Sequence, residues 1–313
     1  MSSIAFTFPG QGSQAVGMGK VLAEHSATAR AVFAEVDEAL GQKLSALMFD
    51  GPEDELTLTA NAQPALMAVS MALMRMLEER GIAVGRAAYV AGHSLGEYSA
   101  LCAAGTFSLA DTARLLRIRG NAMQAAVPVG AGAMAAIIGA EADAVAQLCR
   151  DAAQGETCQI ANDNGGGQLV ISGSAAAIAR AIEAAPGIGA KRAIPLTVSA
   201  PFHSALMQPA ADAMREALAK VEMKAPAVPV IANVTVSPLS EPTEIAARLV
   251  EQVTGQVRWR ETVEWFAAHG ITTLYEVGSG KVLTGLAKRI SKDVSGVAVG
   301  TVDDVEALAG ALG

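Results

Sequence analysis

Ser94 lies in a segment whose residue types and spacing suit a nucleophilic serine. Gly92 and Gly96 flank it in the pattern Gly-x-Ser-x-Gly, with small apolar residues before the segment and good helix formers after it. A tight strand-to-helix turn needs such glycines because the backbone doubles back closely there. The turn places the hydroxyl at a helix N-terminus, where free N–H groups favour developing negative charge. The segment therefore predicts a nucleophile elbow, although Gly-rich turns of this kind also occur without catalysis.

Arg119 is the second residue with distinctive chemistry, in a predicted helix over 108–126. At about 100° per residue, its neighbours on the helix surface include Leu115, Leu116 and Met123, all of them apolar. A guanidinium on an apolar face is costly unless it is paired. Two interpretations stay open from these residues alone. Arg119 is either one half of a buried structural ion pair or a fork that grips the carboxylate of a ligand.

Gln11 and His203 adjoin turns that fix the backbone. Gln11 lies between two glycines after a predicted strand at 4–8, and His203 follows a proline-restrained turn and precedes a helix. Because the carboxyl ends of parallel strands meet at one edge of a sheet, Gln11 and Ser94 are expected at the same rim. The alternatives are a plain connecting loop at Gln11 and a structural histidine at 203, which is the commoner role of an isolated histidine.

A second serine between glycines occurs at 278–280, after a predicted strand over 272–277, and Lys281 follows it. The lysine suggests a phosphate-binding loop, but the spacing of that motif is absent and Val282 takes the place of its Ser or Thr. A plain strand-to-helix turn is the favoured interpretation.

The elements that position these residues are typical of an α/β fold. Short apolar segments alternate with helical ones through most of the chain, which indicates a parallel sheet. Its strands are expected at 4–8, 87–91, 226–236, 272–277 and 296–302.

The pattern changes near residue 129. Strands are predicted at 133–139, 157–161, 169–173 and 190–196, with helices at 141–153 and 174–185. The resulting order β-α-β-β-α-β is the ferredoxin-like arrangement. We therefore expect a large domain formed by 1–127 and 198–313, and a small subdomain of 128–197 inserted into it. Functional sites often lie in the cleft between two such lobes.

Composition excludes several other classes of protein. The 313 residues carry a net charge of −8 and no basic tract, which argues against nucleic-acid binding. No secretory signal is evident, and the most apolar segment, 64–77, is too short to span a bilayer. The three scattered cysteines lack metal or redox spacing and fit a reducing cytoplasm, and the four histidines are too dispersed to indicate a metal site.

Taken together, the motifs resemble those of one family. Gly-Gln-Gly-Ser-Gln around Gln11, Gly-His-Ser-Leu-Gly around Ser94, Arg119, Pro-Phe-His ending at His203, and Gln252 occur in one order. That set resembles the malonyl-CoA:acyl carrier protein transacylases of fatty-acid synthesis over nearly the whole chain. The resemblance implies an α/β-hydrolase-like core, with a mostly parallel sheet, that carries the inserted ferredoxin-like subdomain.

The resemblance also implies a role for each matching position. Ser94 would carry the acyl group as an ester, with His203 as general base and then general acid. The backbone carbonyl of Gln252 would orient His203 in place of a triad carboxylate, so that a change of the Gln252 side chain is expected to do little. The backbone N–H groups of Gln11 and Leu95 would form the oxyanion hole.

The same resemblance assigns the selection of the acyl group. Arg119 would grip the free carboxylate of a malonyl group, which supplies the anion that its apolar surroundings lack. Phe202 would crowd an α-methyl branch, and Met123 would line the same pocket. His93 and Asn162 are explained at least as well as structural residues.

The implied reaction is ping-pong. Malonyl passes from malonyl-CoA to Ser94 and then to the phosphopantetheine thiol of acyl carrier protein, without a cofactor or metal. The carrier is an acidic, transient partner, so a local basic patch must outweigh the negative charge of this chain. Lys191, Arg192, Lys288 and Arg289 are candidates, or else ordinary solvated charges. We expect a cytoplasmic monomer without nucleic-acid or membrane partners.

Three alternatives remain open. A serine hydrolase that releases acyl groups to water fits the elbow equally well. A stand-alone acyltransferase of a polyketide or malonate-decarboxylase system would share the motifs. A catalytically inactive docking lobe would form no ester on Ser94. The position of Arg119 and the missing triad acid favour a transferase.

Overall fold

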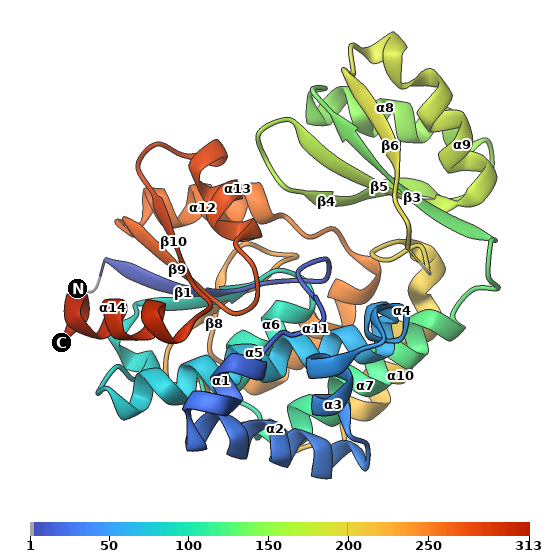
Figure 1. The fold of residues 1–313 in the computed structure, drawn as a ribbon. Coiled ribbons are helices and arrows are strands. Elements are labelled where there is room, and N and C mark those ends of the chain that lie inside the picture. Colours follow the sequence, from blue (N-terminus) through green and yellow to red (C-terminus); the bar gives the residue numbers. More distant parts are fainter. Residues whose placement is uncertain (1–2, 199) are drawn as a thin grey trace.

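A six-stranded, mostly parallel sheet organises the larger part of the molecule (Figure 1). The computed structural model describes residues 3–198 and 200–313. The strand order is β10-β9-β1-β2-β7-β8, and only the β7–β8 pair is antiparallel. The strands are β1 (Ile4–Phe8), β2 (Tyr89–Gly92), β7 (Val230–Ile231), β8 (Pro238–Leu239), β9 (Thr273–Val277) and β10 (Ser295–Val299).

Helices cover both faces of this sheet, as the buried strands of a parallel sheet require. They are α1 (Lys20–His25), α2 (Ala27–Leu40), α3 (Leu44–Asp50), α4 (Glu53–Thr57), α5 (Thr59–Glu79), α6 (Leu95–Ala103), α7 (Leu109–Ala125), α10 (Gln208–Leu218), α11 (Pro242–Thr254), α12 (Trp259–Ala268), α13 (Val282–Ile290) and α14 (Val302–Leu312). Short 3-10 helices are η1 (Val84–Arg86), η2 (Ala185–Ile188) and η3 (Ala205–Met207).

The two faces of the sheet belong to different cores because successive side chains of a strand point to opposite sides. Ala5 and Ala91 pack with Trp259 and Phe266 of α12, in the smaller core. Phe6, in contrast, belongs to the larger core, which contains α5 and α6. The pairing of Phe8 with Gly92 ends β1 and β2 at the same level, so the loops after them share one rim of the sheet.

One expected strand is much shorter than predicted. In place of a strand over 226–236, only Val230–Ile231 pairs in the sheet, and the chain turns back into β8. Pro226 and Pro229 cannot donate hydrogen bonds to a neighbouring strand, which shortens the segment at its start. At its end, Asn233 leaves the strand and turns its side chain toward the rim instead.

The smaller unit has its own four-stranded antiparallel sheet, in the order β4-β5-β3-β6. Its elements are β3 (Gly132–Ile138), α8 (Ala142–Ala153), β4 (Cys158–Asp163), β5 (Gln168–Ser174), α9 (Ala175–Ala184) and β6 (Arg192–Pro195). The order βαββαβ and the mixed α/β class are thus confirmed. All of these elements lie within the predicted subdomain of 128–197, whose limits stay a prediction.

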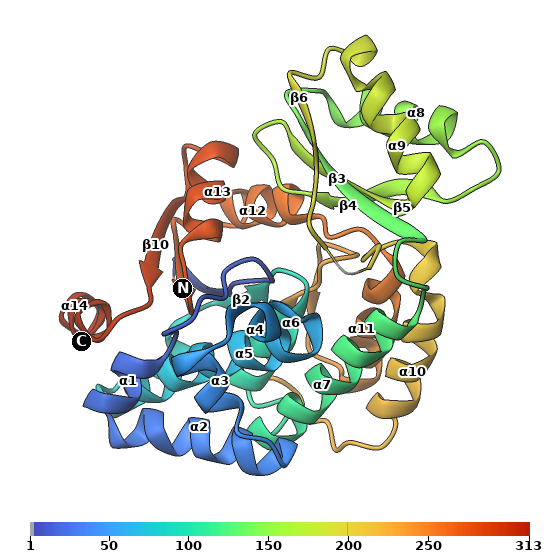
Figure 2. The ribbon, with the colours of Figure 1, turned by 45° about the vertical axis from the view of Figure 1, so that its right-hand side comes forward.

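The smaller unit lies at one end of the larger one, with β4 next to α12 (Figures 1 and 2). A backbone bridge holds the two together: Asp163 N–H donates to Val257 O at 2.9 Å, and Val257 N–H donates to Ala161 O at 2.8 Å. Arg260 forms a salt bridge with Asp163 at 2.8 Å beside it. Within the described ranges, no helix has the length and hydropathy needed to cross a membrane.

Candidate active site

Ser94 lies on the tight turn between β2 and α6, as the glycine pattern predicts. A Cβ atom on Gly92 would lie 1.9 Å from the carbonyl group of Gly96, and one on Gly96 would lie 2.3 Å from Phe8 O. Only glycine therefore fits at either position. Ser94 itself has a φ of 55°, in the region that L-residues seldom occupy. Such strain persists where the surrounding structure holds it in place, and it is common at active sites.

His203 lies directly against the Ser94 hydroxyl. Its Nε2 is 2.8 Å from Ser94 Oγ, and its Nδ1 is 2.9 Å from Gln252 O and 3.2 Å from Gly255 O. Because carbonyl oxygens only accept, Nδ1 carries the proton and Nε2 is the acceptor that faces the serine. No Asp or Glu in the described part of the chain bonds to this ring. The backbone carbonyls take the place of a triad carboxylate.

Burial holds His203 in the neutral form. Removal from water, and then the charge of Arg119, lower the pKa of His203 to about 3. A neutral imidazole with its free nitrogen toward a serine is the form that accepts the serine proton. The electrostatics of the site therefore match the geometry of a general base.

Arg119 reaches the same hydroxyl from α7. It is 1% exposed, and its Nη2 donates to Ser94 Oγ at 3.1 Å and to Gln252 Oε1 at 2.9 Å. Its Nη1 donates to Gln63 Oε1 at 2.8 Å. None of the described carboxylates forms a salt bridge with it, and burial lowers the pKa of this guanidinium. The structural ion pair that the sequence left open is not found among the described residues, which favours the carboxylate of a ligand as its partner.

These residues line one cavity of about 340 Å³ between the two units. The larger unit contributes Gln11, Ser94, Leu95, Arg119, Met123, Phe202 and His203, and the smaller unit contributes Met134, Asn162, Asn164 and Val170. The cavity thus contains every predicted catalytic and substrate-binding residue and both oxyanion-hole residues. Gln252 lies just behind it.

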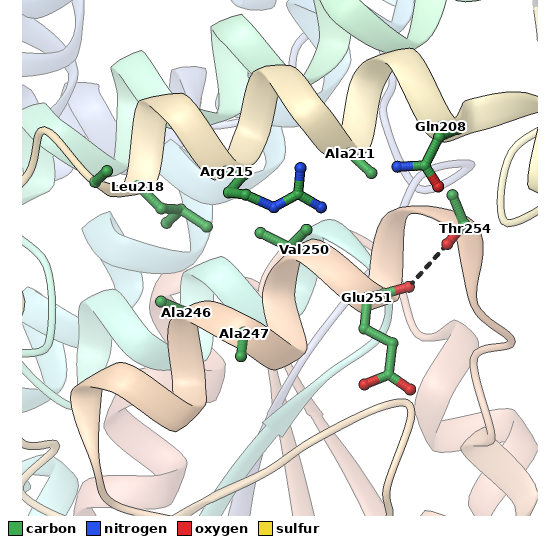
Figure 3. Close-up of a pocket in the computed structure, with 10 residues that line it drawn as sticks. Gln208, Ala211, Arg215, Leu218, Ala246, Ala247, Val250, Glu251 and Thr254 are labelled. Carbon is green, nitrogen blue, oxygen red and sulfur yellow. Dashed lines mark hydrogen bonds between the residues drawn. The ribbon is translucent and has the colours of Figure 1, made fainter.

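A larger cavity, of about 560 Å³, lies between α10 and α11 (Figure 3). It contains none of the predicted site residues. Its two charged side chains have partners nearby, since Arg215 pairs with Asp212 at 2.6 Å and Glu251 with Arg248 at 2.5 Å. Size alone would select the wrong cavity, whereas converging polar groups select the smaller one.

The predicted oxyanion hole has free donors. Leu95 is the first residue of α6, and the first N–H groups of a helix have no partner within it. No described residue accepts a hydrogen bond from the backbone N–H of Leu95 or Gln11. The Gln11 side chain is held separately, because its Oε1 accepts from Thr59 Oγ1 at 2.8 Å.

His93 and Asn162 are tied into the contact between the two units. His93 Nε2 lies 2.9 Å from Asn164 Oδ1 and its ring packs against Trp259, while Asn162 forms the backbone bridge to Val257. Both also touch the cavity. The described residues contain no group of three or more His, Cys, Asp or Glu side chains placed to hold a metal ion.

Sequence reasoning missed three buried residues that support the site. Gln63 bonds to Arg119, Asn233 bonds to the backbone of Ser94, and Glu97 bonds to both Asn233 and Gln252. A polar residue within an otherwise apolar helix was the available signal for Gln63 and Glu97. The Gln252 side chain was expected to do little, yet its amide is fully buried and forms four of the hydrogen bonds at this site.

Fold and site together define an acyl transferase. The family model described as the acyl transferase domain matches residues 5–304, and the chain belongs to this family.

Its relatives carry a more specific name. The chain is 48% identical over 307 residues to the malonyl CoA-acyl carrier protein transacylase of Bacillus subtilis, covering 98% of this chain and 96% of that protein. It is also 48% identical over 313 residues to the protein of that name from Escherichia coli K12, covering 100% and 99%.

Solved structures agree. The acyl-carrier-protein-S-malonyltransferase of Bartonella henselae is 64% identical, with a TM-score of 0.97 and 99% of both chains covered. A malonyl-transacylase in complex with its type II PKS acyl-carrier protein is 43% identical, with a TM-score of 0.95, and 98% of this chain and 99% of that one are covered. The resemblance to malonyl-CoA:acyl carrier protein transacylases is confirmed.

Proposed function

We propose that this chain transfers a malonyl group from malonyl-CoA to the phosphopantetheine thiol of acyl carrier protein, in fatty-acid biosynthesis, through an ester on Ser94. One observation carries the proposal. Ser94 Oγ lies 2.8 Å from the imidazole of His203 and 3.1 Å from the guanidinium of Arg119, in a cavity between two units. The names of close full-length relatives support the choice of substrate and acceptor.

In the first half-reaction, Ser94 Oγ attacks the thioester carbonyl while His203 Nε2 takes the hydroxyl proton. The negative charge on the carbonyl oxygen is met by the backbone N–H groups of Gln11 and Leu95. The imidazolium is stabilised by the carbonyl oxygens of Gln252 and Gly255, both of which accept from His203 Nδ1. The carbon–sulfur bond then breaks and His203 returns the proton to the CoA thiolate.

In the second half-reaction, the same groups work in reverse. His203 takes the proton of the phosphopantetheine thiol, the sulfur attacks the ester carbonyl, and the proton returns to Ser94 Oγ as the ester bond breaks. The net change is an exchange of one thioester for another. As proposed, this transfer uses no cofactor or metal.

Arg119 would select the malonyl group. A carboxylate that reaches the guanidinium gives a buried cation its missing partner, whereas a neutral acyl chain would displace water and leave the charge unmatched. Phe202 and Met123 line the cavity and would limit its width, so we expect a branched acyl group to fit poorly.

The carrier protein would dock beside the smaller unit. Lys191 and Arg192 at the start of β6, and Lys288 and Arg289 at the end of α13, are all exposed. None of them forms a salt bridge within the described residues. The loop 165–167 lies between the two pairs, since Arg289 packs against Gly166 and Gly167 O accepts from Gly139 N–H beside Lys191. We infer that these four cations bind an acidic carrier protein. We also propose that the chain acts as a monomer in the cytoplasm.

The test is a two-step incubation. Brief exposure to malonyl-CoA should add one malonyl group to the protein by intact mass spectrometry, and peptide mapping should place it on Ser94. Addition of holo carrier protein should move the group to the carrier. No adduct would indicate a docking lobe without catalysis, and free malonate without malonyl-carrier would indicate a hydrolase. Rates with carriers from fatty-acid and polyketide systems distinguish the two pathways.

A further inference from the structure

Glu97 is a buried carboxyl group without an obvious reason to be there. It lies in the first turn of α6, is 1% exposed, and forms no salt bridge with any described cation. Carboxyl groups are rarely this buried unless they are paired. Glu97 does not line the cavity of Ser94, so it is not placed to touch the substrate. Burial raises the pKa of Glu97 to about 7, despite its hydrogen bonds and the nearby charge of Arg119.

The partners of Glu97 are the residues that hold the elbow. Its Oε2 accepts from Gln252 Nε2 at 2.8 Å and from Asn233 N–H at 3.1 Å. Gln252 Nε2 also donates to Ser94 O at 3.0 Å. The Asn233 side chain accepts from Ser94 N–H at 2.8 Å and donates to Gly92 O at 2.7 Å. Both backbone groups of the strained serine are thus held by Gln252 and Asn233, which bond to Glu97 through the Gln252 side chain and the Asn233 backbone N–H.

The acceptor at Glu97 also helps to set the direction of the Gln252 amide, with the shortest of the three hydrogen bonds of its nitrogen. The NH₂ group of Gln252 donates to Glu97 Oε2, and Ser94 O and Asn233 Oδ1 accept from the same nitrogen at 3.0 and 3.3 Å. The amide oxygen then faces Arg119 Nη2, at 2.9 Å. If the amide were reversed, its oxygen would face the carboxylate and its NH₂ group would face the guanidinium, with no hydrogen bond to either. Glu97 therefore contributes to the orientation of Arg119 through the Gln252 amide, beside the direct bond from Arg119 to Gln63.

We propose that Glu97 is a positioning residue for malonyl transfer: through the Gln252 amide and Asn233, it holds the Ser94 turn and aims the Arg119 guanidinium at the carboxylate of the acyl group. This inference rests on the proposed function. It makes malonyl selectivity, and not only stability, depend on a residue outside the cavity.

The test compares acyl groups within one preparation of each variant. The rates of ester formation on Ser94 from malonyl-CoA and from acetyl-CoA are measured by rapid quench and intact mass, and their ratio is taken. The ratio is independent of any inactive fraction. Glu97→Leu removes the acceptor at similar volume, and we expect the malonyl-to-acetyl ratio to fall at least tenfold. Glu97→Gln keeps one acceptor oxygen and should recover most of the ratio.

Glu276 supplies the matched control. It is also a fully buried glutamate, and it accepts from the backbone N–H groups of Leu283 and Thr284 at the start of α13, away from the cavity. Glu276→Leu should lower the melting temperature while leaving the malonyl-to-acetyl ratio within twofold of the parent.

An unchanged ratio in Glu97→Leu would overturn the proposal and leave Glu97 a purely structural residue. If Glu97→Leu does not fold, Glu97→Asp gives the same measurement, because it withdraws the carboxylate by one methylene, and an unchanged ratio there has the same meaning. Failure of the proposed function is a separate result, since the parent protein itself would then form no malonyl ester.

Discussion

Two strand-to-helix turns of the central sheet place a serine near flanking glycines, at Ser94 after β2 and at Ser279 after β9. Their side chains have different surroundings. Ser94 Oγ contacts an imidazole and a guanidinium in the cavity between the two units. Ser279 Oγ donates to Ser13 O at 2.8 Å, which only fastens one loop to another. Similar local composition thus serves catalysis in one turn and packing in the other.

The helix N-termini after the two turns differ in the same way. At α13, the carboxylate of Glu276 takes the N–H groups of Leu283 and Thr284 at 3.0 and 2.7 Å, so this end is already occupied by an anion. At α6, the N–H of Leu95 has no acceptor among the described residues. A filled helix end stabilises the fold, and an open one can stabilise charge that develops during a reaction. This difference also confirms the plain turn expected at 278–280.

In the described part of the chain, the turn at Ser94 therefore keeps polar groups without charged or hydrogen-bonding partners, whereas the corresponding groups at the Ser279 turn are paired. Ser94 sits in a strained backbone conformation, and the cation beside it has only neutral partners within the described ranges. Such features cost stability and persist because surrounding bonds hold them. The comparison teaches that unsatisfied groups converging from distant segments, and not the glycine pattern, mark the catalytic turn.

The largest expected effect separates the two serines. Ser94→Ala should form no malonyl ester, and its transfer rate should fall by roughly four orders of magnitude or more, because the nucleophile is lost. Ser279→Ala should retain the parent rate, since its hydroxyl bonds only to a loop carbonyl. Intact mass after exposure to malonyl-CoA and a carrier assay check both variants. A slow Ser279→Ala enzyme, with its fold intact, would show that the second turn contributes to the reaction.

Arg119→Ala should have the next largest effect, on selectivity. The cavity would lose its cation, so the preference for malonyl-CoA over acetyl-CoA should fall by about a hundredfold or more, with acetyl transfer gained. The measurement is the ratio of kcat/KM for the two substrates. Arg117, on the same helix, bonds to Asn61 and Gln42 instead of the site, so Arg117→Ala is the control and should keep the parent ratio. Unchanged acyl preference in Arg119→Ala would remove this residue from substrate recognition.

The sequence was sufficient for the residues whose chemistry is local or motif-bound. The glycine spacing predicted the turn at Ser94, and the apolar neighbours of Arg119 marked an unusual cation. Alternating patterns also predicted the βαββαβ unit, because strand and helix periods are readable over short windows.

The sequence was not sufficient for residues whose role depends on tertiary contacts. Asn233 and Glu97 lie 136 positions apart in the sequence, yet they bond to each other. Asn233 also bonds to Ser94 and Gly92 in the nucleophile elbow. No local pattern encodes that meeting. The predicted strand over 226–236 was wrong for a related reason. Its apolar content suggested a long strand, but prolines shorten its start, and Asn233 leaves the strand to accept a hydrogen bond from Ser94 N–H. Side-chain networks under an active site require the fold itself.

The smallest expected effect concerns the stability cost of the buried base. The pKa of His203 is lowered from 6.5 to about 3 in the folded protein, so the unfolded chain binds the proton more readily. The contribution of this residue to stability is therefore complete above pH 6.5 and is lost as pH falls toward the folded pKa, by up to about 1.4 kcal/mol per pH unit. The comparison is His203→Asn, which does not titrate and whose side chain tolerates the positive φ of this position. On acidification, the free energy of unfolding of the parent should fall relative to that of this variant.

Denaturant unfolding of both proteins between about pH 7 and pH 5 measures that difference, and titrating groups that do not interact with His203 cancel in the subtraction. A difference that stays constant over this range would mean that His203 takes up its proton without unfolding. The imidazole would then be accessible to water or paired with an anion. The Ser94 site would then not be the desolvated site that distinguishes it from the turn at Ser279.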